Sequence, residues 1–129
     1  MSYALSTTVS TSYDETVQAV REALQEQGFG VLTEIDLQAT LKKKLDVDVA
    51  PQVILGACRP PLAHAALQAE PSIGLLLPCN VTVRETDAGT IVEAVDPQTM
   101  VTMTDNPDLQ KVADEAKQRL ESALAALSA

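Results

Sequence analysis

Apolar and polar residues alternate with a period of two in several stretches of the chain, a pattern typical of half-buried β-strands. In the second stretch, the alternation places Phe29, Val31, Thr33 and Ile35 on one strand face. A predicted hairpin turn at residues 87–89 joins the fourth and fifth stretches. The predicted strands are residues 3–9, 29–35, 52–58, 79–84 and 90–95, and residues 99–103 are expected to form a short further strand.

Helical spacing of apolar residues appears between these stretches, together with helix start and stop signals. Ser12 and Glu15 form a capping box, and Gly28 ends the predicted helix 13–27. Asp36 is expected to cap a short helix that contains three consecutive lysines, and Pro61 suits the first turn of a helix that continues to residue 69. A long amphipathic helix closes the chain, with an apolar stripe made of Leu109, Val112, Ala113, Ala116, Leu120, Leu124 and Leu127.

The order of these elements predicts an α+β fold rather than a repeated βαβ unit. In the fourth strand Val81 and Val83 face one way while Thr82 and Arg84 face the other, as an antiparallel sheet covered on one face requires. We therefore expect an antiparallel sheet with helices packed on one face and a long C-terminal helix. The 129 residues are enough for one core, so residues 1–129 are expected to form a single domain.

The acidic composition argues against several classes of partner. The net charge is −9, there is no Trp, and Phe29, Tyr3 and Tyr13 are the only aromatic residues. Proteins that bind nucleic acid without sequence preference use a basic groove and aromatic rings, so we expect no nucleic-acid partner. No apolar run approaches the ~20 residues of a membrane span, and the N-terminus lacks a signal-peptide pattern, so we expect a cytoplasmic protein without a membrane partner.

The segment 56–80 contains the thiol and imidazole side chains of the chain, together with several prolines and glycines and an apolar run. Cys58 and Cys79 are the only thiols of the chain, and His64 is its only imidazole. Together they could hold zinc or another thiophilic metal, although their spacing matches no zinc-finger pattern. A second reading is thiol redox chemistry at Cys58, whose pKa the following helix and Arg59 would lower. The third is that both cysteines are buried and inert.

Glu34 and Asp36 form a second candidate site. They lie two residues apart and therefore share a strand face, where two carboxylates could act as an acid/base pair or as ligands for a hard metal ion. The competing reading is structural, with helix capping and a salt bridge to Lys42 or Lys44.

Several motifs resemble those of bacterial domain of unknown function family 302. They are GFGVLTEID (28–36), LKKKL (41–45), LGAC (55–58), LAHAAL (62–67), GLLLPCNV (74–81) and VDP (95–97), and the resemblance extends from residue 13 to residue 124. Arg59 stands where the family more often has asparagine. The resemblance implies a β-α-β4-α fold related to the TATA-binding-protein topology, and dimers, but it supplies no catalytic residue. Kinship of topology does not imply DNA binding.

Two functional hypotheses follow. The first is a homodimeric, non-enzymatic binding module with a small apolar ligand pocket bordered by residues 56–80 and no evident cofactor. The second is a metal-dependent or thiol-dependent enzyme that uses Cys58 and Cys79, with His64 as a ligand or base. The weak candidates for ligand binding are Glu34, Asp36, Cys58, His64 and Cys79.

Overall fold

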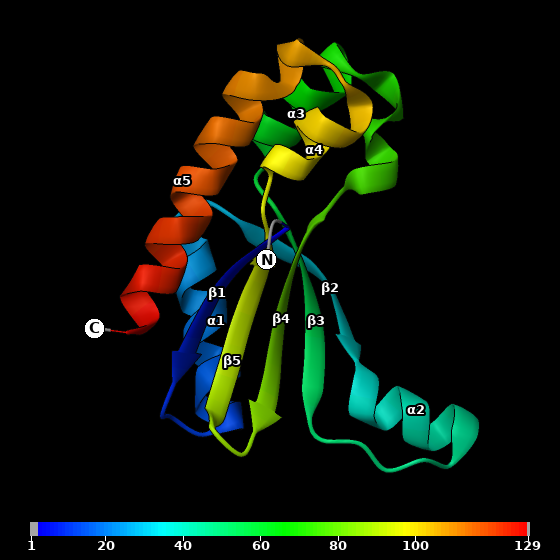
Figure 1. Cartoon of the computed structure of the whole chain (residues 1–129), viewed down its shortest axis with the longest axis vertical. Coiled ribbons are helices and arrows are strands. Elements are labelled where there is room, and N and C mark those ends of the chain that lie inside the picture. Colours follow the sequence, from blue (N-terminus) through cyan, green and yellow to red (C-terminus); the bar gives the residue numbers. More distant parts are fainter. Residues whose placement is uncertain (1–2, 129) are drawn as a thin grey trace.

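An antiparallel sheet forms the centre of the protein. The computed structural model describes residues 3–128, and within them the five strands lie in the order β1-β5-β4-β3-β2, with every neighbouring pair antiparallel (Figure 1). The strands are β1 (Ala4–Val9), β2 (Gly30–Asp36), β3 (Gln52–Cys58), β4 (Cys79–Thr86) and β5 (Gly89–Val95). This arrangement confirms the predicted α+β class.

The helices form two groups around this sheet. α1 (Tyr13–Glu26) and the second half of α5 (Gln110–Leu127) cover one face of the sheet, and the other face stays open (Figure 1). Beyond the ends of the strands lies what we call the helical cap: α3 (Pro60–Ala69), the 3-10 helices η1 (Pro71–Leu76) and η2 (Pro107–Leu109), α4 (Gln98–Thr104) and the first half of α5. α2 (Leu37–Leu45) projects from the opposite end of the sheet. None of the helices in residues 3–128 is both long enough and apolar enough to cross a membrane.

The helix ends follow the signals in the sequence. The Ser12 side chain accepts a hydrogen bond of 3.2 Å from the Glu15 amide, as the capping box predicts. Gly28, just after α1, has a φ of +83°, which a residue without a Cβ adopts at no steric cost. Asp36 accepts a bond of 2.9 Å from the Ala39 amide and so caps α2. These predictions are confirmed.

A bulge in β2 reverses part of the predicted strand face. Val31 pairs with Ala57 and Thr33 with Gly56, so Leu32 has no partner of its own on β3 and is 66% exposed. Because one extra residue turns every later side chain to the other face, Thr33 and Ile35 lie on the open face. The prediction that Phe29, Val31, Thr33 and Ile35 share one face is therefore wrong.

The predicted short strand at residues 99–103 is also wrong, because these residues belong to α4. The Asp96 side chain accepts the Gln98 amide proton at 2.9 Å and starts the helix. Thr102 and Thr104 satisfy their hydroxyl groups by donating to the carbonyls of Gln98 and Met100, four residues earlier. Packing of the Met100 side chain, which is 5% exposed, stabilises the helix in spite of its β-branched residues.

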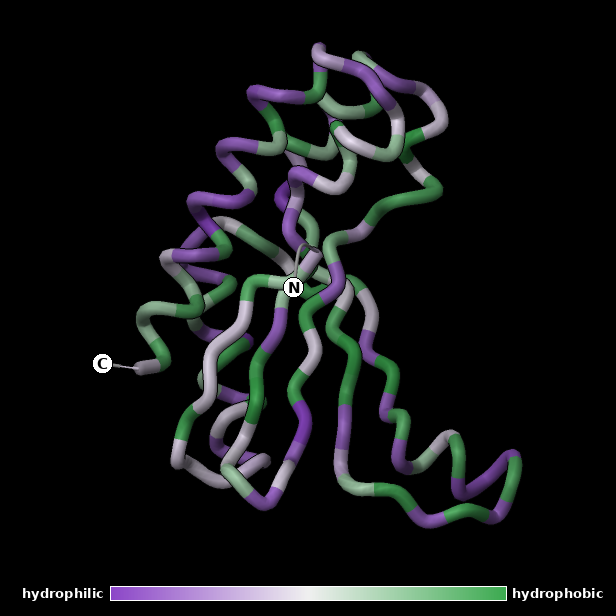
Figure 2. Tube along the Cα trace, viewed as in Figure 1, coloured by the Kyte–Doolittle hydropathy of each residue, from purple (hydrophilic) through white to green (hydrophobic). Residues whose placement is uncertain are grey.

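Two apolar cores lie on either side of the strand ends, and Figure 2 shows apolar stretches in both regions. The sheet core joins β3, β4 and β5 to α1 and the end of α5, and the cap core joins α3, η1, α4 and the start of α5. α5 is thus common to both cores. Its buried residues are Val112 and Ala113 in the cap core and Leu120, Ala123 and Leu124 in the sheet core, with Ala116 between them.

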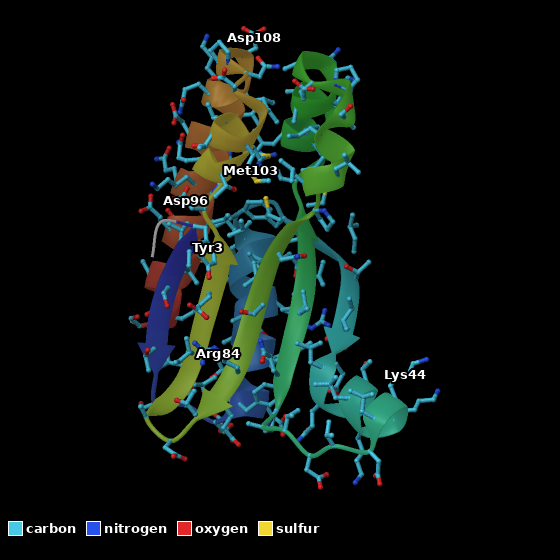
Figure 3. All side chains as sticks on the ribbon, turned by 45° about the vertical axis from the view of Figure 1, so that its right-hand side comes forward. Tyr3, Lys44, Arg84, Asp96, Met103 and Asp108 are labelled. Atoms are coloured by element: carbon cyan, nitrogen blue, oxygen red, sulfur yellow. The ribbon has the colours of Figure 1, made fainter. Side chains whose placement is uncertain are left out.

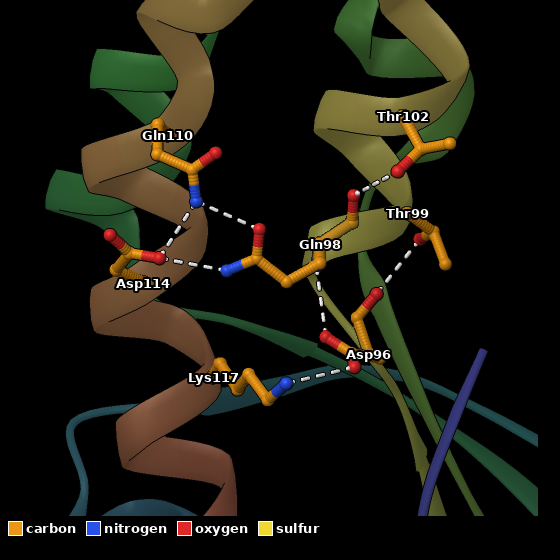
Figure 4. Close-up of polar contacts among 7 residues, drawn as sticks. All are labelled: Asp96, Gln98, Thr99, Thr102, Gln110, Asp114 and Lys117. Atoms are coloured by element: carbon orange, nitrogen blue, oxygen red, sulfur yellow. Dashed lines mark hydrogen bonds and ion pairs between the residues drawn. The ribbon is translucent and has the colours of Figure 1, made fainter. Parts of the chain in front are cut away.

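A polar network fixes α4 against α5 where β5 enters the cap, near the labelled Asp96 in Figure 3. The Lys117 ammonium lies 3.1 Å from the Asp96 carboxylate, which is largely buried (Figure 4). Gln98 and Gln110 each donate to Asp114 at 2.8 Å, and these hydrogen bonds, more than nearby Lys117, hold the pKa of Asp114 below its ordinary value. The network therefore joins the end of β5 and the start of α4 to α5.

Replacing Leu120 by alanine should lower the free energy of unfolding by about 2–5 kcal/mol, because the Leu120 side chain is 1% exposed in the sheet core. The control is Ser122→Ala on the exposed side of α5, which should cost less than about 0.5 kcal/mol. Urea unfolding measures both. Small and equal effects would show that α5 is peripheral to the core.

Replacing Lys117 by methionine should cost about 1–2 kcal/mol, because it leaves the Asp96 carboxylate, only 13% exposed, without its ionic partner. Lys111→Met is the matched control, since Lys111 is exposed on the same helix and forms no ion pair within residues 3–128. Thermal unfolding of the two variants at pH 7 makes the comparison. If Lys117→Met is as stable as Lys111→Met, the network does not hold the cap.

Candidate functional site

A small apolar cavity lies at the seam between the two cores, where the strand ends meet the helical cap. Its volume is about 20 Å³. A cavity needs roughly 10–15 Å³ to hold one water molecule, so this one has room for a single water. Its walls come from the end of β3, the start of β4, α3, α4 and α5, and they are formed by Phe29, Ala57, Cys58, Arg59, Leu62, Ala63, Ala66, Leu77, Pro78, Cys79, Met100, Val112 and Ala116.

Both cysteines line this cavity. Cys79 pairs with Ala57 across β3 and β4, which places it beside the neighbouring Cys58, and both thiols are free. Cys79 is buried and Cys58 is half-buried. Burial, and to a lesser extent the proximity of Cys58, raises the pKa of Cys79 to about 11. The structure thus brings together two thiols that stand 21 positions apart in the sequence, and Cys79 stays protonated at neutral pH.

Side chains of neighbouring segments approach the backbone closely at Gly56, next to Ala57 of the cavity wall. A Cβ added to Gly56 would lie 2.8 Å from Cγ of Pro78 and would clash with the Thr33 side chain. Glycine is therefore required where β3 passes between the bulged strand β2 and the Leu77–Pro78 turn that leads into β4. This position lies within the 56–80 segment, and the close approach explains why a strand interior carries a glycine.

Arg59 lies at the edge of the cavity, and the sequence identifies it only as a neighbour of Cys58 and as a departure from the family motif. It is the residue before α3, and its guanidinium passes over Gly28. Nε of Arg59 is buried without a hydrogen-bond partner within residues 3–128, and it lies 3.8 Å from the Glu115 carboxylate. Arg119 binds the same carboxylate more closely, at 2.9 Å. Arg59 therefore keeps hydrogen-bonding capacity beside an apolar cavity.

His64 does not join the two cysteines. It is exposed on α3 and does not line the cavity. Within residues 3–128, no group of three or more His, Cys, Asp or Glu side chains is placed to hold a metal ion. The structure therefore does not assemble Cys58, His64 and Cys79 as three ligands of one metal, and the two thiols alone are brought together.

Glu34 and Asp36 lie far from this cavity along the sheet. Gly30 pairs with Cys58 at one end of β2, whereas Asp36 pairs with Val53 at the other. The Glu34 carboxylate forms an ion pair with Arg21 of α1, and Asp36 caps α2. The predicted capping is confirmed, and the predicted salt bridge to Lys42 or Lys44 is wrong.

The position of the lysines explains this difference. Lys42 binds Asp46 at 3.0 Å and Asp48 at 3.2 Å, because the chain turns back after α2 and brings these two carboxylates to the last helical turn. The two carboxylates of β2 instead affect Tyr13. Its pKa is raised by burial first, and then by the charges of Asp36, Asp14, Glu34 and Glu85.

A wider hollow of about 330 Å³ lies on the open face of the sheet. It is formed by strand side chains and contains neither thiol nor the spare donor of Arg59. The residues around it are Tyr3, Ala4, Asn80, Thr82, Glu93, Ala94 and Val95. The seam cavity is therefore where reactive and hydrogen-bonding groups meet an apolar wall.

Comparison with known proteins identifies the family. The model of the family "Domain of unknown function DUF302" matches residues 5–127, and the chain therefore belongs to this family. The crystal structure of the uncharacterized conserved protein DUF302 from Bacillus stearothermophilus is similar to this chain, with 30% sequence identity and a TM-score of 0.91. The similarity covers 98% of this chain and 99% of the other. A comparison with curated proteins gives no match.

The two thiols should differ in reactivity. With a pKa near 11, on the order of one Cys79 thiol in a thousand is ionised at pH 8, and the residue is also buried. Iodoacetamide should therefore alkylate half-buried Cys58 of the native protein at pH 8 at least tenfold faster than it alkylates Cys79. Peptide mass spectrometry measures the two rates. Cys58→Ser should remove the fast reaction, whereas Cys79→Ser should retain it. Equal rates for the two thiols would contradict this assignment.

Proposed function

We propose that this DUF302 domain is a homodimeric binding module that takes up a small apolar ligand at the seam between the sheet core and the helical cap. The observation that carries the proposal is the seam cavity, whose wall comes largely from the turn-rich segment 56–80. Ligand pockets are concave and mostly apolar, with a few polar groups that fix orientation. Here the thiol of Cys58 and the spare donor of Arg59 are such groups.

Uptake of a ligand requires the seam to widen, because about 20 Å³ holds no more than a water molecule. Several residues of the cavity wall can move to widen the seam. Leu62, Leu77 and Met100 belong to the cap side of the seam, and methionine is an unbranched side chain that adapts to irregular space. The cap has its own core, so α3 and α4 can shift by a small amount relative to the sheet while α5 stays in place and the sheet core stays packed. We place the module in a reducing compartment such as the cytoplasm, where both thiols stay unpaired.

Native mass spectrometry of the protein purified from its own host tests this proposal. The expected result is a dimer that carries a small molecule. Ala63→Leu, which extends a side chain into the cavity from α3, should reduce the bound fraction at least fivefold. Gln68→Leu adds a similar apolar side chain on the exposed side of the same helix and should leave the bound fraction unchanged. An empty wild-type protein at micromolar concentration, or equal loading of the two variants, would refute ligand binding at the seam.

A second candidate function, a thiol-dependent or metal-dependent enzyme, is supported by the placement of Cys58 and Cys79 on one cavity wall. The thiol form of this hypothesis fits the geometry better, since His64 lies outside the cavity. Elemental analysis and thiol titration of purified protein distinguish it from simple binding. If the protein holds no transition metal and both thiols react only after denaturation, the cysteines are structural and this second candidate fails.

A further inference from the structure

The segment 32–49 extends from the sheet as an arm, opposite the helical cap. It consists of the bulged end of β2, the nine-residue helix α2 and the chain that turns back toward β3. None of the residues of α2 is buried, and in Figures 1 and 3 the helix projects away from the body with the labelled Lys44 near its outer end. An isolated helix shorter than roughly 12–15 residues is marginal in water, so α2 lacks the packing that normally stabilises so short a helix.

Exposed apolar side chains are concentrated on this arm. Nine large apolar side chains are exposed within residues 3–128, and five of them belong to the arm. Figure 2 shows the apolar and polar positions alternating along the same projecting segment. The five are Leu32, Ile35, Leu45, Val47 and Val49, exposed by 66%, 46%, 66%, 41% and 38%. Several exposed apolar side chains gathered on one projecting segment are typical of a protein–protein interface.

The charge of the arm favours a second copy of the same chain as its partner. The chain has a net charge of −9, so most surfaces of two copies repel each other. The arm carries Lys42, Lys43 and Lys44 against Glu34, Asp36, Asp46 and Asp48, three positive against four negative charges, for a net charge of −1. The repulsion between two copies is therefore weakest where their arms meet.

The order of these charges also makes the arm self-complementary. Glu34 and Asp36 precede α2, whereas the three lysines lie in its last turn, where Asp46 and Asp48 pair with Lys42. Two arms placed antiparallel about a two-fold axis therefore set the basic end of one helix against the acidic start of the other. Lys43 and Lys44 form no ion pair within residues 3–128, so both are available for this contact. A two-fold interface uses the same surface on both copies, as this arrangement requires.

We propose that the arm is the dimer interface of this protein, where α2 and the end of β2 pack against the same elements of a second copy. The proposal rests on the homodimer of the proposed function and adds the surface that makes it. Association buries the five exposed apolar side chains and supplies α2 with the packing that the single chain does not give it. Because Asp36 and Cys58 lie at opposite ends of the β2–β3 pair, the interface leaves the seam cavity accessible.

Leu45→Glu tests the interface, since it places a carboxylate at an apolar position that is already 66% exposed and should not disturb the monomer fold. Size-exclusion chromatography with light scattering, over a concentration series of the full chain, should give a dimer dissociation constant at least tenfold higher than that of the wild type. The matched control is Leu75→Glu in η1, a leucine that is 87% exposed outside the arm and whose replacement should leave the constant unchanged within twofold.

The outcomes separate this proposal from the proposed function. A wild-type dimer that Leu45→Glu weakens no more than Leu75→Glu overturns the arm interface but leaves the dimer intact through another surface. A wild-type monomer at 100 μM overturns both the arm interface and the dimer, and leaves a different macromolecule as the partner of the arm. Ligand binding at the seam is then decided separately by the Ala63→Leu variant. If Leu45→Glu does not fold, hydrogen exchange of the wild type decides instead. The amides of α2 should then be more protected at high than at low protein concentration, and protection independent of concentration overturns the interface.

Discussion

The packing of the apolar stripe of α5 into both cores is the interaction on which the rest of the structure depends. The first half of α5 packs in the helical cap through Val112 and Ala113, and the second half covers the sheet through Leu120 and Leu124. Neither group of elements is large, and a small core contributes only a few kcal/mol once the entropy of the chain is subtracted. Sharing one helix lets the two cores stabilise each other. The shared helix also creates a seam where it passes from one core to the other, and the cavity beside Ala116 lies at that seam.

Local rules were sufficient to predict the elements whose residues agree with their surroundings. The Ser12 and Asp36 caps follow from local hydrogen bonds between a side chain and the backbone amide three residues on, and the α5 stripe follows from the burial of its apolar residues, so the sequence predicts all three correctly. Prediction failed where tertiary packing opposed the local pattern. The bulge at Leu32 leaves no trace in a strand that alternates regularly, and α4 depends on hydrogen bonds that Asp96 accepts and on the burial of Met100.

The candidate site was predictable to the same limited degree. The density of cysteines and turn residues pointed to the segment 56–80, which supplies most of the cavity wall. Single residues were not predictable, because their roles depend on elements distant in the sequence. His64 lies outside the cavity because α3 presents it to solvent, and Arg59 reaches the edge because Gly28 of a different segment leaves space beneath its guanidinium. The carboxylates Glu34 and Asp36 are held by Arg21 and by the start of α2.

Ligand uptake at the seam requires α3 and α4 to move away from the sheet without global unfolding. Native-state hydrogen exchange at increasing, sub-denaturing urea concentrations tests it most directly, because it resolves the opening free energy of separate parts of one structure. We expect the amides of α3 and α4 to exchange through a partial opening, with a lower free energy and a smaller urea dependence than the amides of β3, β4 and β5. Identical free energies and urea dependences in these helices and the sheet would show that the protein opens only as one unit, and would exclude a separate opening of the seam.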